Sequence, residues 1–189
     1  MKTSIGGKTL LFPAPVLIVG TYDDKHRPNV MTVAWGGICC SQPPCVAVSL
    51  RKATNSYGNI VRRQAFTVNI PSEDKVKEVD YFGIASGRNE DKFERTGLTP
   101  VASDLVDAPY IAEFPMVLEC RVLHIFEIGL HTEFVGEILD IKAEEAVIGK
   151  NGNPDMGKLK PIAYEPVNRR YFRIGSFLAK AQSVGRAIS

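Results

Sequence analysis

A chain of 189 residues with 44% hydrophobic and 23% charged side chains has the composition of an ordinary globular protein, and we expect one domain over residues 1–189. Its net charge of +2 is too small to favour a general binder of nucleic acids or of anionic membranes. The apolar runs are short and the first residues lack the apolar core of a signal peptide, which predicts a cytoplasmic protein without a membrane span.

Strand patterns open the chain. Residues 15–21 form a short apolar run, residues 22–28 are rich in turn-forming and charged side chains, and residues 29–35 resume the apolar pattern. This order predicts a β-hairpin with a long loop. Two further runs, residues 45–50 and 65–70, are rich in β-forming side chains and predict the next two strands.

Cap signals predict three short helices. Thr54 can accept a hydrogen bond from an orphan backbone N–H group and so begin the first helix, and Ser72 is the equivalent cap for the second. A third helix is predicted over residues 90–95, with Asn89 as its cap and Gly97 at its end.

The second half of the chain is again rich in strands. Long β patterns over residues 116–127 and 132–142 are joined by a turn at residues 128–129, residues 151–157 predict a loop, and residues 170–175 predict a last strand. Six or more strands with helices inserted irregularly favour a mainly β fold with α additions, built as an antiparallel barrel. The sequence holds neither a dinucleotide-binding G-x-G-x-x-G after its first strand nor a P-loop.

The cysteine pattern leaves two interpretations open. Cys39, Cys40, Cys45 and Cys120 are too few for a disulfide scaffold, and no pair has the C-x-x-C spacing of a zinc site, so no metal is expected. The simpler interpretation is that all four are small core residues. The alternative is a redox-active thiol, because the first three directly follow the strand predicted over residues 29–35.

Two segments combine the groups that a phosphate requires. Cations, hydroxyl groups and backbone N–H groups at a helix start all favour phosphate binding. The residues concerned are Ser49, Arg51, Lys52, Thr54 and Asn55 before and at the first helix, and Ser86, Gly87, Arg88 and Lys92 before and in the third. Each basic residue alone could be a solvated surface charge, but their grouping at two helix starts favours a phosphate site.

The strand predicted over residues 29–35 could form a flat wall for a ring. Side chains alternate between the two faces of a strand, so one face can pack into the barrel. Asn29, Met31, Val33 and Trp35 share one face, and Val30, Thr32 and Ala34 share the other. The smaller face would leave backbone amides beside the isoalloxazine ring of a flavin. The pattern alone is also that of an ordinary half-buried strand.

Five segments taken in order resemble one known family. They are residues 28–35, 49–55, 66–71, 86–97 and 131–137. Together they resemble the flavin reductase-like, FMN-binding split-barrel family, most closely its flavoredoxin branch. The likeness extends from about residue 15 to about residue 185, and it is the order of the segments rather than any one of them that is specific.

The resemblance implies a six-stranded Greek-key barrel, a homodimer, and one FMN per subunit near the subunit interface. It implies that the ring is lined by Met31, Thr32, Val33, Ala34 and Trp35. It implies that the phosphate and ribityl chain are held by Ser49, Leu50, Arg51, Thr54 and Asn55. Ala85, Ser86, Gly87 and Lys92 would then close the site.

His131 is the candidate catalytic residue that the resemblance implies. It matches a histidine that lies near the ring and the nicotinamide in reductase members, where it could donate a proton or hydrogen bond during reduction. Those members usually have an acidic residue just before this histidine, whereas this chain has Leu130. The alternative is that His131 is a packing residue at the start of a strand.

Three functions remain open from the sequence. The favoured one is an electron-transfer protein of flavoredoxin type, in which bound FMN carries electrons between redox proteins. The second is an oxidoreductase that uses NAD(P)H to reduce flavin or ferric iron. The third is a structural barrel without a flavin. The absence of a nicotinamide-binding motif and the missing acid before His131 weaken the second function.

Overall fold

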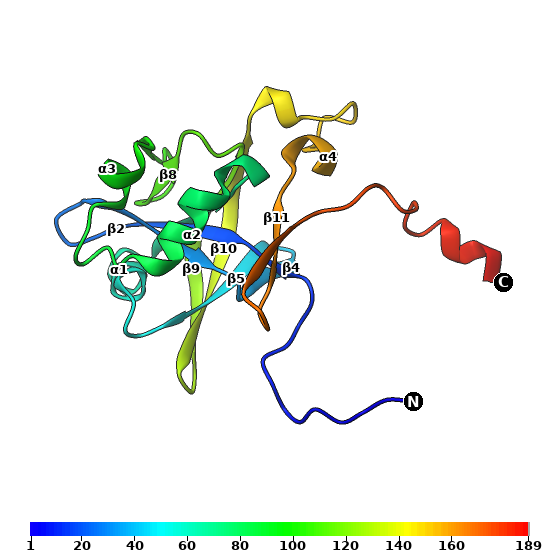
Figure 1. Ribbon diagram of the computed structural model, residues 1–189. Coiled ribbons are helices and arrows are strands. Elements are labelled where there is room, and N and C mark those ends of the chain that lie inside the picture. The colour runs from blue at the N-terminus through cyan, green and yellow to red at the C-terminus, as the bar shows by residue number, and fades with distance from the viewer. Residues whose placement is uncertain (189) are drawn as a thin grey trace.

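The structure is a computed structural model that describes residues 1–188 (Figure 1). Its main element is a seven-stranded antiparallel sheet with the order β3-β2-β6-β9-β10-β5-β4. These strands are β2 (Leu17–Tyr22), β3 (Pro28–Val33), β4 (Gly36–Ser41), β5 (Pro44–Arg51), β6 (Ala65–Ile70), β9 (Met116–Ile128) and β10 (His131–Ala143). The mainly β class with α additions is therefore confirmed.

The two outer strands of this sheet are neighbours in the chain. Strand β3 ends at Val33 and β4 begins at Gly36, so only Ala34 and Trp35 separate them. A sheet whose first and last strands are joined by so short a link must curl until its edges meet, because each residue spans at most about 3.6 Å. The result is a barrel with a seam at Ala34 and Trp35. The sheet has seven strands rather than the expected six because β4, which follows the seam, forms an additional outer strand.

The inside of the barrel is one hydrophobic core. Val19 of β2, Val48 of β5, Phe66 of β6, Cys120 of β9 and Phe134 of β10 are all fully buried in it. Since these residues come from strands on all sides, the sheet surrounds the core rather than lying flat on it.

A second core lies on the outside of the barrel. The neighbouring β2 residue, Ile18, points away from the first core and packs with Val30 of β3 and with Val79 and Phe82 of α2 (Val76–Ile84). Adjacent residues of one strand face opposite sides, so β2 is buried on both. The helix α2 is thereby fixed across β3, which makes it one wall of the candidate site.

The remaining elements surround the barrel. They are β1 (Ala14–Pro15), α1 (Asn55–Arg63), η1 (Glu73–Lys75), α3 (Lys92–Thr96), β7 (Pro100–Ala102), β8 (Pro109–Ile111), η2 (Glu145–Val147), α4 (Met156–Leu159), β11 (Ile162–Glu165), β12 (Arg170–Arg173) and η3 (Val184–Ile188). Strands β1, β11 and β12 form a small sheet, and β7 pairs with β8. Among residues 1–188, no helix is both long enough and apolar enough to cross a membrane.

The helix caps differ from the predicted ones in two of three cases. Thr54 caps α1 as predicted, since its Oγ1 accepts a hydrogen bond from the Tyr57 backbone N–H at 3.3 Å. Ser72 makes no capping bond, because its hydroxyl bonds to Asp74 instead. The third helix begins behind Asp91 rather than Asn89: the Asp91 carboxylate accepts bonds from two backbone N–H groups of the first turn.

Several other expectations need correction. Strand β4 was not predicted, because its run of glycines and cysteines carries no β-forming signal. Cys39 and Cys40 on this strand are exposed, so the expectation of four core cysteines holds only for Cys45 and Cys120. The predicted loop 151–157 contains the start of α4.

Three parts of the chain extend from the compact body. Figure 1 shows the chain leaving the barrel at both ends and the tip of the β9–β10 hairpin projecting from it. The hairpin carries exposed Phe126 and Ile128, and the C-terminal segment carries exposed Phe177 and Leu178. Apolar side chains so exposed are typical of surfaces that another molecule covers.

Candidate functional site

Three cavities follow strand β3 along the outside of the barrel. Cavity A, of about 230 Å³, lies between the start of α1, the end of α2 and residues 85–87. Cavity B, of about 300 Å³, lies beside Thr32 and Ala34, and cavity C, of about 580 Å³, lies at the seam around Trp35. Cavities A and B share Gly83, and cavities B and C share Ala34. The three therefore form one groove along β3.

Cavity A is lined by the predicted helix start. Thr54 holds the first turn of α1, because its Oγ1 donates to the Arg51 carbonyl at 2.9 Å as well as accepting from Tyr57. The first backbone N–H groups of an α-helix lack partners within the helix and attract anions. Thr54, Asn55 and Ser56 all line the cavity. An anion placed here would meet this helix end.

Lys92 is the only ionisable side chain among the described residues that line cavity A. It is 4% exposed, and its Nζ donates to the carbonyls of Val30 and Phe82 at 2.8 and 2.9 Å. Burial lowers the pKa of Lys92 to about 8. An ammonium group has three N–H donors, so one remains for a ligand. Lys92 both ties β3 to α2 and supplies positive charge.

Asn29 and Gly87 meet closely in cavity A. The Asn29 Nδ2 donates to Ser56 Oγ at 3.0 Å, whereas its buried Oδ1 has no hydrogen-bond partner among the described residues. A Cβ atom on Gly87 would lie only 1.9 Å from that Oδ1, so any other residue there would have to displace the Asn29 side chain. A buried amide oxygen without a partner costs about 1 to 3 kcal/mol unless a ligand satisfies it. It is suited to accept from a hydroxyl group.

Cavity B has an aromatic and hydroxyl lining. The Tyr171 hydroxyl donates to Asp80 Oδ1 at 3.0 Å, and burial together with this bond raises the pKa of Tyr171. Thr32 Oγ1 donates to the Val79 carbonyl at 2.5 Å, which fixes β3 against α2. Tyr171 therefore remains protonated over the whole physiological range and presents a rigid edge to the cavity.

Trp35 forms the wall of cavity C. Its ring contacts that of His131 at a centroid distance of 4.5 Å, with the planes tilted by 37°. Trp35 is 43% exposed, and the cavity is also lined by Ala34, Ser49 and residues 8–11 of the N-terminal segment. A large aromatic surface left open at a barrel seam is a suitable wall for a planar ring.

The predicted site residues fall into three groups. Met31, Thr54, Asn55, Ala85, Ser86, Gly87 and Lys92 line cavity A, and Thr32, Ala34, Trp35 and Ser49 line cavities B and C. Val33 and Leu50 are core residues inside the barrel. Arg51 is exposed and lines none of the three cavities. His131 does not line cavity C itself, but its ring contacts Trp35, which does. Lys52 is engaged elsewhere, in an ion pair with Glu127 at 2.6 Å.

Several residues that line the groove were not predicted from the sequence. They include Ser56, Gly83 and Tyr171, and Asn29 as a ligand-facing side chain. Asn29 carried a usable signal, because an amide among apolar residues of a strand needs a partner when it is buried. Tyr171 carried none, since it comes from a strand about 140 positions further along the chain than β3.

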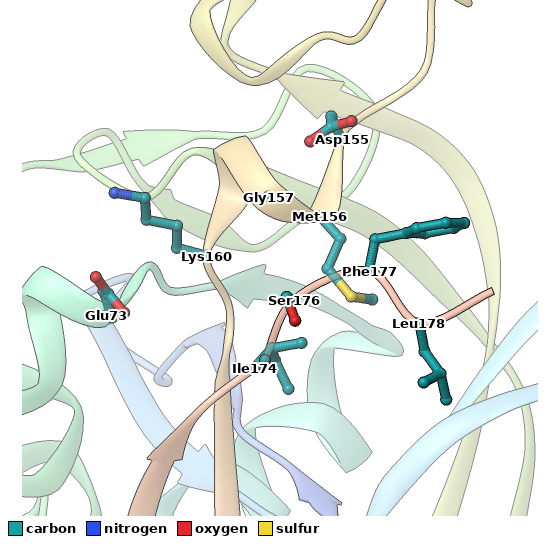
Figure 2. Close-up of a pocket in the computed structure, with 10 residues that line it drawn as sticks. Glu73, Asp155, Met156, Gly157, Lys160, Ile174, Ser176, Phe177 and Leu178 are labelled. Carbon is teal, nitrogen blue, oxygen red and sulfur yellow. The ribbon is translucent and has the colours of Figure 1, made fainter.

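A further cavity lies away from this groove. It has a volume of about 730 Å³ and is lined by α4, Glu73 and residues 174–178 of the C-terminal segment (Figure 2). In Figure 2, Met156 of α4 points toward the segment that carries Ser176 and Phe177. One wall of this cavity is an extended segment rather than the barrel, so we do not place the functional site here.

Known proteins similar to this chain identify its family. A family model described as Flavin reductase like domain matches residues 9–173. The chain belongs to this family. Its structure is similar to that of the flavoredoxin of Desulfovibrio vulgaris (Miyazaki F), with 54% identity and a TM-score of 0.94 over 98% of this chain and 100% of that chain.

Two other family relatives extend the comparison. A flavoredoxin from Methanosarcina acetivorans is 28% identical, with a TM-score of 0.93 over 100% of both chains. An uncharacterized protein of Archaeoglobus fulgidus is 37% identical over 131 residues, which cover 69% of this chain and 73% of that protein. The resemblance drawn from the five sequence segments is confirmed, and so is the flavin reductase-like split-barrel class.

The groove residues fit a phosphorylated flavin by their chemistry. Cavity A offers a helix start, a lysine proton and an unpaired amide oxygen, which match a phosphate and a hydroxylated chain. Cavities B and C offer the small side chains of Thr32 and Ala34 and the Trp35 ring, which match a flat apolar group. Among residues 1–188, no carboxylate lines cavity A itself; Asp23, Glu90 and Asp91 line a neighbouring cavity of about 120 Å³ that shares Asn29, Asn55 and Gly87 with it.

Proposed function

We propose that this protein binds one FMN per subunit in the groove along β3 and acts as an electron-transfer protein of flavoredoxin type. The observation that carries the proposal is the donor set of cavity A, which joins a helix start, the third proton of Lys92 and the unpaired Asn29 oxygen. The similarity to a flavoredoxin at 54% identity supports the same conclusion.

The chain's residues divide the binding task between them. The start of α1, Ser86 and Lys92 would hold the phosphate, and Asn29 would accept a hydrogen bond from the ribityl chain. Thr32, Ala34 and Trp35 would flank the ring. Bound FMN would supply the redox chemistry, while the protein supplies position, electrostatics and protection from water.

An absorbance spectrum of the purified protein tests cofactor binding. A visible flavin band that stays with the protein through gel filtration, and releases FMN rather than FAD on denaturation, is the expected result. A colourless protein that does not take up added FMN would contradict the proposal and favour a structural barrel without flavin. The electron donor is tested by anaerobic mixing: a carrier stays oxidised with NADH or NADPH alone and is reduced by a redox protein or dithionite.

The second candidate function is an NAD(P)H-dependent flavin or ferric reductase. The observation in its favour is the size of cavity C, about 580 Å³ beside the aromatic pair Trp35 and His131, which could admit a second planar group. Rapid loss of the flavin band on mixing with NADH or NADPH alone would support it.

Substitution of His131 tests whether this residue has a chemical role or a packing role. We expect His131→Ala to retain FMN, because the groove itself lacks this side chain, and to slow reduction by about 10²- to 10⁴-fold if the imidazole acts as a general acid. His124→Ala, on the exposed face of β9, is the matched control. Unchanged reduction in both variants would make His131 a support for Trp35, and loss of FMN would make it part of the pocket.

We propose in addition that two subunits pair, as the family resemblance implies. The support on the surface is the β9–β10 hairpin, whose distal part carries Phe126, Ile128 and Leu130 with exposed fractions of 51%, 59% and 64%. Isolated apolar residues are common on surfaces, but a projecting apolar hairpin favours a covered face. A cytoplasmic location remains part of the proposal.

A further inference from the structure

We infer that Cys40 and Cys45 form a reversible disulfide by exchange with a low-molecular-weight disulfide. The hairpin of β4 and β5 would then be a site of thiol oxidation that is independent of the flavin.

The pairing register places the two cysteines opposite each other. Cys40 of β4 and Cys45 of β5 are direct partners in the antiparallel ladder. Opposite residues in such a ladder have Cα atoms about 4.5 to 5.5 Å apart and side chains on the same face. Disulfides join Cα atoms roughly 4.4 to 6.8 Å apart. The backbone therefore already has the spacing that a disulfide needs.

The two thiols also point to the same place. Cys40 Sγ contacts the Gln42 carbonyl and Cys45 Sγ contacts the Pro43 carbonyl, both at 3.4 Å. Gln42 and Pro43 are the adjacent residues that join β4 to β5. Burial raises the pKa of the Cys45 thiol, and the Cys40 and Cys39 thiols beside it add to the shift.

Cys39 is excluded from this pair by a β-bulge. The register shifts between Ile38 and Cys40, so Cys39 is the extra residue without a ladder partner. It lines cavity C instead, on the side of Ser49 and Glu133. Cys120 is fully buried in the barrel core and is not accessible to a reagent. Cys40 is therefore the exposed thiol that a reagent can reach, and the buried Cys45 is its direct partner across the ladder.

The chemistry divides into two exchange steps. The exposed Cys40 thiolate attacks one sulfur of the small disulfide, forms a mixed disulfide and releases one small thiolate. The Cys45 thiolate then attacks Cys40 Sγ and releases the second small thiolate. Two protein thiols are oxidised to one disulfide, the small disulfide is reduced to two thiols, and the two protons pass to the released thiols. The link would tie β4, an outer strand of the sheet, to β5.

The test uses the full chain incubated with glutathione and oxidised glutathione at varied ratios. Thiols are then counted by alkylation under denaturing conditions and intact mass. We expect the four free thiols to fall to two, with a mass loss of two hydrogens that dithiothreitol reverses. Flavin-free protein should behave in the same way, so the result does not depend on the proposed function.

Single variants identify the pair. Cys39→Ser and the buried control Cys120→Ser should still lose two free thiols on oxidation. Cys40→Ser and Cys45→Ser should form no intramolecular disulfide. If Cys45→Ser folds poorly, Cys45→Ala provides the same test. The inference is overturned if the wild-type protein keeps four thiols at every ratio. It is equally overturned if Cys45→Ser still forms an internal link, which would assign the disulfide to Cys39 and Cys40.

Discussion

Gly87 packs its backbone against the Asn29 amide, and this contact leads to the first prediction. A methyl group at position 87 would lie 1.9 Å from Asn29 Oδ1 and would displace that side chain from cavity A. We expect Gly87→Ala to weaken FMN binding by about tenfold, the value of one lost hydrogen bond. Fluorescence titration with FMN measures the change.

The control for this prediction is Gly58→Ala in α1. A Cβ atom on Gly58 meets no other atom within 4 Å, so this variant should bind FMN as the wild-type protein does. Equal affinity of Gly87→Ala and Gly58→Ala would show that cavity A does not hold the cofactor.

Lys92 gives a prediction about pH. The pKa of Lys92 is lowered to about 8 in the folded protein from the ordinary lysine value of 10.5, because the ammonium group is buried. Between these two values the unfolded chain holds more protons than the folded one, so the free energy of unfolding rises with pH across this window. The gain is roughly 3 kcal/mol by pH 10.5, since each pKa unit corresponds to about 1.4 kcal/mol.

Denaturant unfolding at pH 7.5, 9 and 10.5 measures this gain. Lys92→Met removes the group, so the stability of the wild-type protein relative to this variant should increase over the series. Lys77→Met, an exposed position on α2, should follow the wild-type curve throughout. A constant difference between wild type and Lys92→Met would mean that Lys92 titrates as an exposed lysine does.

At the scale of single elements, the start of α1 determines the shape of cavity A. Thr54 is the side chain that caps this helix, whereas Ser72 makes no capping bond to the helix that follows it. We expect Thr54→Ala to lower the free energy of unfolding by about 1 kcal/mol, the usual value of a cap, and to weaken FMN binding.

Ser72→Ala is the matched control for the cap. It should change stability by less than about 0.5 kcal/mol, because the Ser72 hydroxyl bonds to the exposed side chain of Asp74 and caps no backbone N–H group. Urea denaturation compares the two variants. A larger loss in Ser72→Ala than in Thr54→Ala would contradict the assignment of the caps.

At the scale of the whole molecule, the projecting β9–β10 hairpin predicts the oligomeric state. If it forms the subunit interface, Phe126→Glu combined with Ile128→Glu should convert the dimer to a monomer, because two charges would be buried against their symmetric copies. Sedimentation velocity detects the change. Leu105→Glu replaces an equally exposed leucine, at 52%, and should leave the dimer intact, because its neighbour Asp104 pairs with Lys142 at the base of the hairpin rather than at the tip. A wild-type monomer would refute the pairing.

Short-range patterns in the sequence were sufficient for most elements. The strands β2, β3, β5, β6, β9 and β10 follow from alternation and β-forming residues, and the α1 cap follows from Thr54. These signals depend on interactions between residues a few positions apart, so the sequence contains them directly. The order of five segments identified the family, and most of the site residues predicted from these segments line the groove.

The features that complete the site depend on pairing between distant strands. Three such features depend on which elements become neighbours. They are the barrel seam at Ala34 and Trp35, the hydrogen bonds of Lys92 to two carbonyls, and the position of Cys40 opposite Cys45. The sequence also could not predict which side chains are buried. Cys39 and Cys40 are of a residue type that is usually buried, but they lie exposed on an outer strand. Local patterns in the sequence were enough to predict six strands of the barrel sheet, the family and the side chains available to the site. Which of these side chains face the groove depends on the folded structure, because burial and partners are set by contacts across the sheet.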